Sequence, residues 1–554
     1  MTTGWTYDFI IVGGGLTGSV IASRLAEKQP AAQILLIEAG PDVSNHPLTS
    51  APLACFGLHG SELDWNYTTV PQKHLHNREC YNAAAKALGG GTAINYGMWT
   101  RGNAADLDRW AEAVGDRAWS YEGLLPYFVR SETHSDPNVD PKKHGRAGPI
   151  YNVSVSASGV NRKYPLGEAI RTAWERVGMH HIPDANGGNP MGIGELTENW
   201  RDGKRQIASE VYRLSEKQNV VVLANTMVSR VLIENREGKN VATGVQVVDG
   251  SRRYMATREV ILTAGVYRTP QILMLSGVGP AKELNRHGIR QLFDSPEVGL
   301  NFHDHFAVVQ WWKLRQPEKG LAIGTPLWTD PDYSKGLPVN WVITTGVPRE
   351  VLVQALQVDG EDVEGNPILA PDVCHLEMFV CYAPAGAHIA NVHVPVDGTH
   401  IATPVLGLAP TSSGSIKLAS ADPTAAPLID PNYYATEVDR AELRWGLRLI
   451  AKLMHDTPEG RAIVDSETTG PEFAPIRPDS SDEEIDERIR CSGNTFYHPA
   501  GSAAMGKVID SKLQVYGVEG LRVADASILP VTVASHYQAV LYAIAEKAAD
   551  LIAG

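Results

Sequence analysis

The chain has 554 residues, of which 43% are hydrophobic and 20% are charged, so it is globular and too long for one hydrophobic core. We expect two or more domains, or one large interleaved body. The net charge of −14 argues against nucleic acid as a partner, because binding phosphates requires clustered Lys and Arg.

The cysteines and the hydrophobic runs exclude further classes. Five cysteines without a C-x-x-C pair favour neither a disulfide framework nor a zinc site. No apolar run reaches the roughly 18 residues that a membrane helix needs. Because Met1 to Trp5 lead directly into an apolar segment, no secretory signal is predicted, and we expect an intracellular, cytoplasmic protein.

The N-terminal segment carries the strongest motif. Tyr7 to Val12 is an apolar run typical of a buried parallel strand, and it ends in a glycine cluster. Gly13, Gly15 and Gly18 have the G-x-G-x-x-G spacing, which permits a tight turn and lets the backbone approach a pyrophosphate. Residues 17–28 follow as a helix whose N-terminal end favours phosphates.

A second predicted strand, 33–37, ends in Glu38, where a carboxylate can accept hydrogen bonds from a ribose 2′-OH. Strand, turn, helix, strand and acidic residue in this order predict a dinucleotide site. An ordinary βαβ turn without a ligand is the alternative. These residues alone leave both FAD and NAD open.

A long irregular stretch, 46–79, then separates this unit from the next glycine cluster. Loops of this length in compact proteins are usually functional, so we expect a cover over a site. It holds four histidines whose spacing matches no metal-ligand motif, and no metal site is predicted: His46, His59, His74 and His76.

Further along, short apolar strands at 220–223, 227–235, 242–248 and 258–263 are expected to return to the nucleotide-binding body, followed by a helix over 269–279. Between 302 and 420 the pattern changes to strands with little helix between them, which predicts a large antiparallel sheet. Its expected strands are 307–314, 339–345, 374–382, 399–409 and 414–418. A helix at 437–454, a capping box at Ser481, a strand at 520–525 and a helix at 539–553 complete the chain.

Several motifs together resemble the glucose-methanol-choline (GMC) flavin oxidoreductases over essentially the whole chain. Beside the N-terminal glycines and Glu38-Ala39-Gly40, the resemblance rests on five segments. These are Ala85 to Asn95, Gly265 to Gly279, Val298 to His305, His498 to Gly506 and Leu521 to Ser527.

The resemblance implies FAD as the cofactor and an α/β, Rossmann-like FAD-binding domain interleaved with an α+β substrate domain on a large antiparallel sheet. We expect residues 1–45, 80–150, 215–300 and 498–554 in the FAD-binding domain, 46–79 as the cover loop, and 151–214 with 301–497 in the substrate-binding domain. The FAD contacts implied in this way are Gly13, Gly15, Leu16, Thr17, Gly18, Glu38, Ala39, Gly91, Asn95, Tyr96, Met98, Val228, Asp525, Ala526, Tyr537 and Gln538.

Two departures from the family pattern carry expectations. Ile94 stands just before Asn95, where members with a covalently linked flavin have histidine, so we expect non-covalent FAD. His536 stands where formate oxidases, which several stretches resemble, have arginine. Without that cation a carboxylate substrate lacks its clamp, so formate is disfavoured as the substrate.

The expected chemistry is oxidation of an alcohol CH–OH to an aldehyde, ketone or lactone. An alcohol releases a hydride to flavin N5 readily only if its hydroxyl proton also leaves, and histidine is the natural base near neutral pH. We assign His498 as this base and His536 as the group that orients the hydroxyl. O₂ or another acceptor would then reoxidise the flavin.

Other functions stay open on the sequence. The same His pair could serve a non-redox, FAD-containing cyclase or dehydratase, a formate oxidase-like activity remains an alternative, and a flavin-binding protein without catalysis is a further one. Phe379, Phe496 and Trp99 hint at an aromatic or apolar alcohol, although core packing explains them equally well. Nothing in the sequence indicates the oligomeric state.

Overall fold

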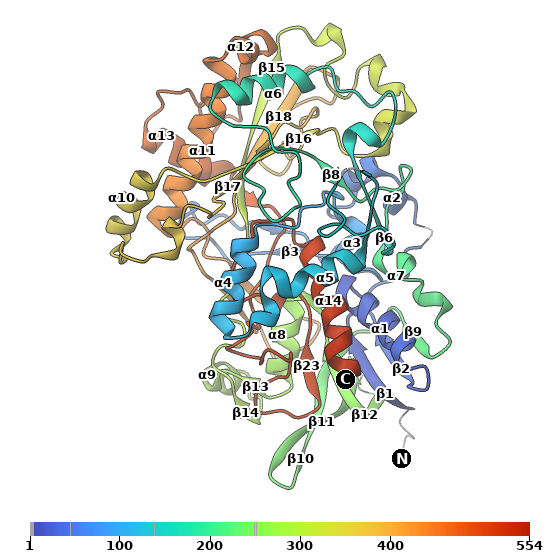
Figure 1. Cartoon of the computed structure of the whole chain (residues 1–554). Coiled ribbons are helices and arrows are strands. Elements are labelled where there is room, and N and C mark those ends of the chain that lie inside the picture. Colours follow the sequence, from blue (N-terminus) through green and yellow to red (C-terminus); the bar gives the residue numbers. More distant parts are fainter. Residues whose placement is uncertain (1–4, 45, 138, 249, 251) are drawn as a thin grey trace.

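The computed structural model describes residues 5–44, 46–137, 139–248, 250 and 252–554. The chain forms two bodies, each built on a large sheet, and passes between them several times (Figure 1). Residues 1–4, on which the expectation of no signal peptide partly rests, lie outside the described part.

The first body is built on a seven-stranded sheet that gathers segments from both ends of the chain. The strand order is β10-β11-β12-β1-β2-β9, and β23 pairs with β12. The strands are β1 (Trp5–Val12), β2 (Ile34–Ile37), β9 (Val220–Leu223), β10 (Val228–Arg236), β11 (Lys239–Val247), β12 (Arg253–Leu262) and β23 (Leu521–Val523). The pairs around β1 and β2 are parallel, as the βαβ reading predicts.

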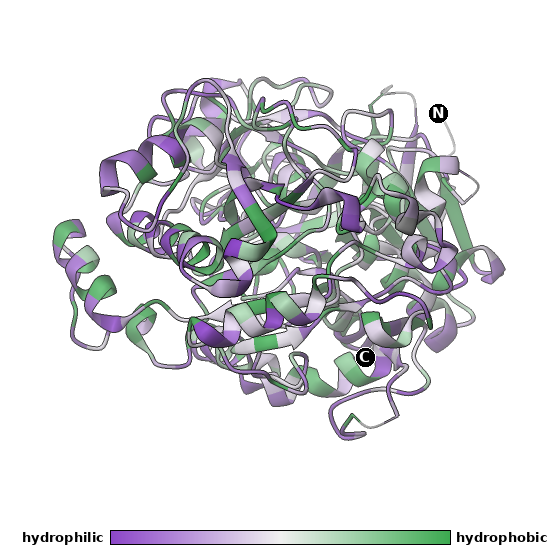
Figure 2. Ribbon diagram, turned by 90° about the horizontal axis from the view of Figure 1, so that it is seen from above, coloured by the Kyte–Doolittle hydropathy of each residue, from purple (hydrophilic) through white to green (hydrophobic). Residues whose placement is uncertain are grey.

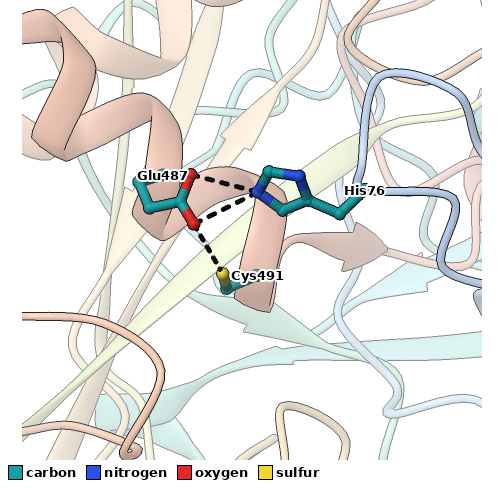
Figure 3. Close-up of side chains that lie close together, drawn as sticks. All are labelled: His76, Glu487 and Cys491. Atoms are coloured by element: carbon teal, nitrogen blue, oxygen red, sulfur yellow. Dashed lines mark hydrogen bonds and ion pairs between the residues drawn. The ribbon is translucent and has the colours of Figure 1, made fainter.

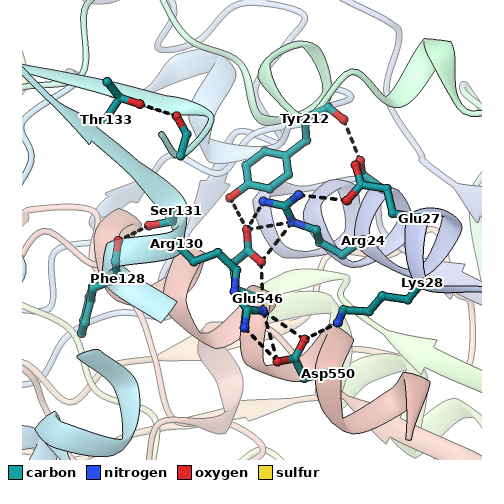
Figure 4. Close-up of polar contacts among 12 residues, drawn as sticks. Arg24, Glu27, Lys28, Phe128, Arg130, Ser131, Thr133, Tyr212, Glu546 and Asp550 are labelled. Atoms are coloured by element: carbon teal, nitrogen blue, oxygen red, sulfur yellow. Dashed lines mark hydrogen bonds and ion pairs between the residues drawn. The ribbon is translucent and has the colours of Figure 1, made fainter. Parts of the chain in front are cut away.

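The helices α1 (Leu16–Lys28) and α14 (Gln538–Ala553) pack against each other in this body, next to α5 (Tyr121–Ser131). A partly buried ion pair joins α1 to α14. The fully buried carboxylate of Glu546 accepts hydrogen bonds from Arg24 Nε at 2.9 Å and from the Tyr212 hydroxyl at 2.9 Å (Figure 4). The C-terminal helix is thereby fixed to the helix of the glycine motif.

The helix α8 (Gly265–Leu275) begins earlier than expected, so Pro270 lies inside the helix rather than near its start. Proline has no N–H, and the carbonyl of Val266, four residues earlier, therefore lacks its helical donor. The Ser502 hydroxyl donates to this carbonyl at 2.6 Å instead. A contact from a distant segment thus makes the proline tolerable.

The second body is built on a seven-stranded sheet of order β21-β15-β18-β17-β16-β7, with β22 paired to β15. All its pairs are antiparallel, as predicted. The strands are β7 (Gly192–Glu195), β15 (Phe306–Leu314), β16 (Trp341–Thr345), β17 (Leu376–Phe379), β18 (His400–Gly407), β21 (Val464–Thr468) and β22 (Asn494–Thr495).

Three helices contact the second sheet: α11 (Glu437–His455), α12 (Pro458–Ile463) and α13 (Asp482–Ser492). A fourth, α10 (Arg349–Asp359), packs on α11. The capping box at Ser481 is present at the start of α13, which confirms that expectation. Seen from above, hydrophilic residues mark several of the outer helices, while the strands inside are mostly hydrophobic (Figure 2). No helix in the described ranges is long and apolar enough to cross a membrane.

One predicted strand does not join the second sheet. Residues 415–417 form β19 (Ser415–Lys417), which pairs only with β20 (Leu428–Asp430) in a separate ribbon. Ile416 and Ile429 belong to the core of the first body, and the Leu418 N–H donates to Glu283 at 3.0 Å. The expectation for 414–418 was therefore wrong about the partner. An alternating pattern of apolar residues indicates that a strand is buried, but it does not indicate which of the two bodies buries the strand.

The stretch predicted as a cover contains short elements: α2 (Pro47–Ser50), a 3₁₀ helix (Pro52–Gly57) and β3 (Tyr67–Thr68), which pairs with β4 (Tyr81–Asn82). The remaining helices and strands lie outside the two large sheets. They are α3 (Gly91–Ile94), α4 (Ala104–Val114), β5 (Glu132–His134), β6 (Ile150–Ser154), α6 (Gly167–Arg176), β8 (Thr197–Glu198), α7 (Ala208–Val211), β13 (Val278–Gly279), α9 (Ala281–Arg286) and β14 (Phe293–Asp294).

Candidate active site

A cavity of about 480 Å³ lies between the two bodies. Its walls come from the end of β1, from the cover, from the inner face of the second sheet and from the C-terminal segment. Every expected site residue except Gly18 lines it. A Cβ on Gly18 would lie 2.0 Å from the Gly13 carbonyl oxygen, so this glycine serves the close packing of helix on strand instead.

The glycine turn leaves backbone open toward the cavity. Gly13 has a φ of +103°, and a Cβ there would lie 2.3 Å from the Thr263 carbonyl oxygen, so only glycine fits. Gly15 is the N-cap of α1 and has no side-chain cap, while a Cβ on it would meet nothing closer than 3.9 Å. The free N–H groups of α1 therefore face open space, as a pyrophosphate site requires.

The Glu38 carboxylate closes this end of the cavity. Its two oxygens accept hydrogen bonds from the backbone N–H groups of Gly14 and Gly40, each at 2.8 Å. Burial raises the pKa of Glu38 to about 7, although these N–H groups favour the ionised form. The carboxylate is thus a fixed acceptor, the role that a ribose hydroxyl needs.

At the other end, the start of α14 is held by amide side chains. Gln538 Oε1 accepts from Asn95 Nδ2 at 3.2 Å and from Asn199 Nδ2 at 3.1 Å, while its Nε2 donates to the Met98 carbonyl. Asp525 accepts from the Gly265 N–H at 2.9 Å and from the Thr269 hydroxyl at 2.7 Å. The cavity thus offers a phosphate cradle, a ribose acceptor and a helix N-terminus, which fit a bound dinucleotide.

His498 and His536 lie side by side on the cavity wall. Their ring centroids are 4.6 Å apart, and the ring planes are inclined at 73°. The two residues are thirty-eight positions apart in sequence, and they meet because the chain passes through β23 and returns before α14. The structure therefore brings together the two imidazoles that the sequence singled out.

His498 is held from behind, on the side away from the cavity. The backbone N–H of His498 donates to Asp304 Oδ1 at 2.9 Å, and the ring Nδ1 of His498 lies 3.0 Å from His305 Nδ1. Its Nε2 makes no hydrogen bond with any described residue. Burial lowers the pKa of His498 well below 6.5, and His536 and His305 lower it further. The ring is therefore neutral near pH 7 and can accept a proton.

The residues behind His498 are themselves buried. Burial lowers the pKa of His305 to about 3 and raises that of Asp304 to about 6. Asp304 also accepts hydrogen bonds from the hydroxyls of Thr495 and Tyr433. His305 is therefore neutral, and one proton shared between the two Nδ1 atoms fixes the orientation of both rings.

His536 has a different partner. Its Nε2 lies 2.6 Å from Glu377 Oε1, and its backbone N–H donates to the Thr100 hydroxyl at 2.6 Å. Glu377 belongs to β17 and is only 1% exposed. The buried Glu377 carboxylate thus holds the ring of His536 in place, and the His536 imidazole is the nearest charge partner of this carboxylate.

Sequence reasoning gave no role to Glu377, His305 or Asp304. His305 and Asp304 stand in one of the motifs used for the family resemblance, but nothing local shows that they contact His498. The available signal for Glu377 was a single acidic residue within the otherwise apolar strand 376–379. Burying such a residue is costly unless a partner satisfies it.

The aromatic residues expected at the substrate wall divide into two groups. Phe379 and Phe496 line the cavity, and the Phe496 ring lies 5.8 Å from that of His536. Trp99 does not line the cavity, because it is buried in the core of the first body with its ring 5.7 Å from that of Tyr542. The hint based on Trp99 was therefore wrong.

One of the four histidines of the cover, His76, belongs to a group that could hold a metal ion. Its Nε2 lies 3.0 Å from Glu487, which with Cys491 comes from α13 (Figure 3). The sequence spacing could not reveal this group. An arginine, Arg490, lies 4.0 Å from the same carboxylate, and burial raises the pKa of the Cys491 thiol to about 11. We interpret the group as a hydrogen-bonded surface pair of His76 and Glu487 beside a protonated thiol.

Comparison with known proteins places the chain in a family. Residues 7–307 and 410–545 match the N- and C-terminal sequence models of the GMC oxidoreductases. The GMC-type oxidoreductase acuG of Aspergillus aculeatus is 43% identical, and the match covers 99% of each chain. Pyranose dehydrogenase 3 of Leucoagaricus meleagris is 32% identical over 99% of this chain and 93% of its own.

The fold agrees with that of solved structures. A variant of Aspergillus oryzae formate oxidase, studied for the modification of its FAD, superposes with a TM-score of 0.89 at 29% identity, covering 100% of this chain and 99% of its own. The chain therefore belongs to the GMC oxidoreductase family. Its members are FAD-dependent, and the cavity described above fits this cofactor.

Proposed function

We propose that the protein oxidises an alcohol CH–OH group to an aldehyde, ketone or lactone, with FAD as the hydride acceptor. The observation that carries this proposal is the Nε2 of His498 on the cavity wall beside His536, for which no described residue is a hydrogen-bond partner. FAD, when bound, supplies the chemistry of hydride acceptance.

The chain's own contribution is to hold and move one proton. The neutral imidazole of His498 accepts the hydroxyl proton of the substrate at Nε2, and the contact between His498 Nδ1 and His305 keeps that nitrogen pointing into the cavity. Because burial lowers the pKa of His498, the base is in its active form at neutral pH.

His536 orients the same hydroxyl. The buried carboxylate of Glu377 holds its ring in place and supports an imidazolium there when negative charge develops on the substrate oxygen. Phe379 and Phe496 supply apolar surface beside the pair, which supports an aromatic or apolar alcohol as the substrate.

The comparisons support oxidation of small molecules by members of this family, among them a pyranose dehydrogenase and a formate oxidase. Formate itself is disfavoured for this chain because residue 536 is a histidine. A carboxylate substrate would be held by a permanently charged side chain such as arginine. We further propose that FAD is bound non-covalently, because Ile94 offers no nucleophile where it lines the cavity. Reoxidation by O₂ is part of the same proposal.

The experiment is an anaerobic titration of the purified, FAD-loaded protein with a panel of sugars, aryl alcohols, short alcohols and formate, followed by flavin absorbance. Bleaching by an alcohol supports the proposal, and subsequent release of hydrogen peroxide in air identifies O₂ as the acceptor. Product without bleaching would replace it by a non-redox cyclase or dehydratase. A flavin that no member of the panel reduces would count against alcohol oxidation.

A further inference from the structure

Arg205 is a buried cation that has no carboxylate partner in the described part of the chain. It is 8% exposed, and its guanidinium donates to three neutral oxygens. Nε donates to the Thr49 carbonyl at 3.0 Å, and Nη1 donates to the Thr92 carbonyl at 3.1 Å and to Asn95 Oδ1 at 2.9 Å. Its Nη2 is buried and has no partner among the described residues.

Three other buried arginines are each neutralised by a buried carboxylate, whereas Arg268, also buried, donates only to neutral oxygens among the described residues. Arg101 pairs with Glu132, Arg162 with Glu198 and Arg488 with Glu467, and in each pair both side chains are buried. A buried charge without such a partner is costly, so its persistence requires an explanation. Burial lowers the pKa of Arg205 only to about 10, so the side chain remains charged at neutral pH.

The position of Arg205 supplies that explanation. Thr92 and Asn95 both line the cavity, and Arg205 contacts them from the side away from it. Asn95 Oδ1 accepts the hydrogen bond from Arg205 Nη1, and Asn95 Nδ2 donates to Gln538 at the start of α14. The guanidinium thus lies one residue behind the wall that we expect to face the flavin.

The surroundings leave this charge unscreened. The Trp200 ring lies 4.7 Å from the guanidinium carbon. The titratable groups that affect Arg205 most are Cys55 and Tyr96, and both are neutral at pH 7 because burial raises their pKa. An enclosed charge acts over a longer distance than an exposed one, because neither water nor salt weakens its field.

We propose that Arg205 supplies a fixed positive charge that stabilises the negative charge gained by FAD on reduction, and so raises the reduction potential of the bound cofactor. This inference rests on the proposed use of FAD. Arg205 does not contact the reacting atoms, so it is a positioning residue that acts by its field and by holding Asn95.

The test measures the midpoint potential of bound FAD by anaerobic equilibration with a reference dye, without any substrate. We expect Arg205→Gln to lower the equilibrium ratio of reduced to oxidised FAD at least tenfold, which is about 30 mV for a two-electron couple. Arg201→Gln, which removes an exposed charge four residues away, is the control and should leave the ratio unchanged within twofold.

A second variant separates charge from structure. Arg205→Lys keeps the charge but loses the planar fork, so at pH 6 it should hold the ratio within threefold of wild type. A Gln variant that binds FAD with an unchanged ratio would overturn the proposal. A Lys variant whose ratio of reduced to oxidised FAD at pH 6 differs tenfold from wild type would also overturn it. The Lys variant alone tests the proposal if the Gln variant does not retain FAD.

The outcome is distinguishable from failure of the proposed function. A wild-type protein that retains no FAD would remove both proposals. A wild-type protein that retains FAD and is reduced by an alcohol, with a potential that does not respond to Arg205, would remove this inference alone.

Discussion

Glu377 Oε1 lies 2.6 Å from His536 Nε2, and both side chains are buried where the second sheet meets the C-terminal segment. His498, the neighbouring imidazole, has another imidazole behind it instead of a carboxylate. The two histidines of the pair therefore differ in their partners: burial and the neighbouring imidazoles lower the pKa of His498, whereas His536 lies against a carboxylate. This difference supports the proposal that His498 accepts the proton and His536 stabilises charge on the substrate oxygen.

The first prediction concerns Glu377→Gln. The amide keeps the shape but removes the negative charge, so an imidazolium at His536 loses its support. We expect flavin reduction by the best alcohol substrate to slow by about 10- to 100-fold. This loss is no larger than the loss expected when one general acid–base group is removed. Stopped-flow absorbance measures this rate. Glu442→Gln, a buried glutamate of the same body, is the control, and an equal loss in both variants would contradict the assigned role.

The second prediction is the pH dependence of kcat/KM. A base works only when unprotonated, and the pKa of His498 lies well below 6.5 because of burial and of the neighbouring imidazoles His536 and His305. The rate should therefore stay level from neutral pH down to below pH 6.5 and fall only in more acidic solution. An acidic limb centred at or above pH 6.5 would show that His498 is not shielded in this way.

The third prediction concerns stability and the buried carboxyl of Glu442. It is 1% exposed, its Oε1 has no partner among the described residues, and burial raises its pKa well above 4.5. The folded protein therefore keeps a proton that the unfolded chain releases above pH 4.5. Stability falls as pH rises from that value toward the folded pKa, by up to about 1.4 kcal/mol per pH unit.

Glu442→Gln removes this dependence because an amide does not titrate. We expect the Tm of the variant, relative to wild type, to be higher at pH 7.5 than at pH 5. Thermal unfolding of both proteins at the two pH values measures it. A difference in Tm that does not change with pH would mean that Glu442 is ionised in the folded protein.

The fourth prediction concerns the attachment of FAD. Ile94, which lines the cavity just before Asn95, cannot form a bond to the cofactor. Acid precipitation of the loaded protein should therefore leave the flavin in the supernatant, with a colourless pellet. Flavin absorbance that stays with the denatured chain after washing would show a covalent link through another side chain.

Local signals in the sequence were sufficient for much of the first body. The strand, glycine turn and helix from Tyr7 to Lys28 were predictable because periodicity and glycine spacing act within a few residues. The strand over 220–223 has the predicted bounds. The pair of histidines was predictable only through the family resemblance, which placed both near the flavin.

The remaining features depend on contacts between distant segments. The strand at 414–418 was assigned to the wrong sheet because the core that buries Ile416 is not visible in its own pattern. The helix α8 begins before Pro270 because Ser502 satisfies the carbonyl that proline leaves free. Glu377 contacts His536 across 159 positions, and no local pattern encodes such a pairing.

The central claim is that His498 accepts the proton of an alcohol while bound FAD is reduced. The most direct measurement is the rate of anaerobic flavin reduction in wild type and in His498→Ala, each loaded with FAD to the same extent. We expect the variant to keep its FAD and to be reduced ~10²–10⁴ times more slowly. Reduction at the wild-type rate in the variant would contradict the account.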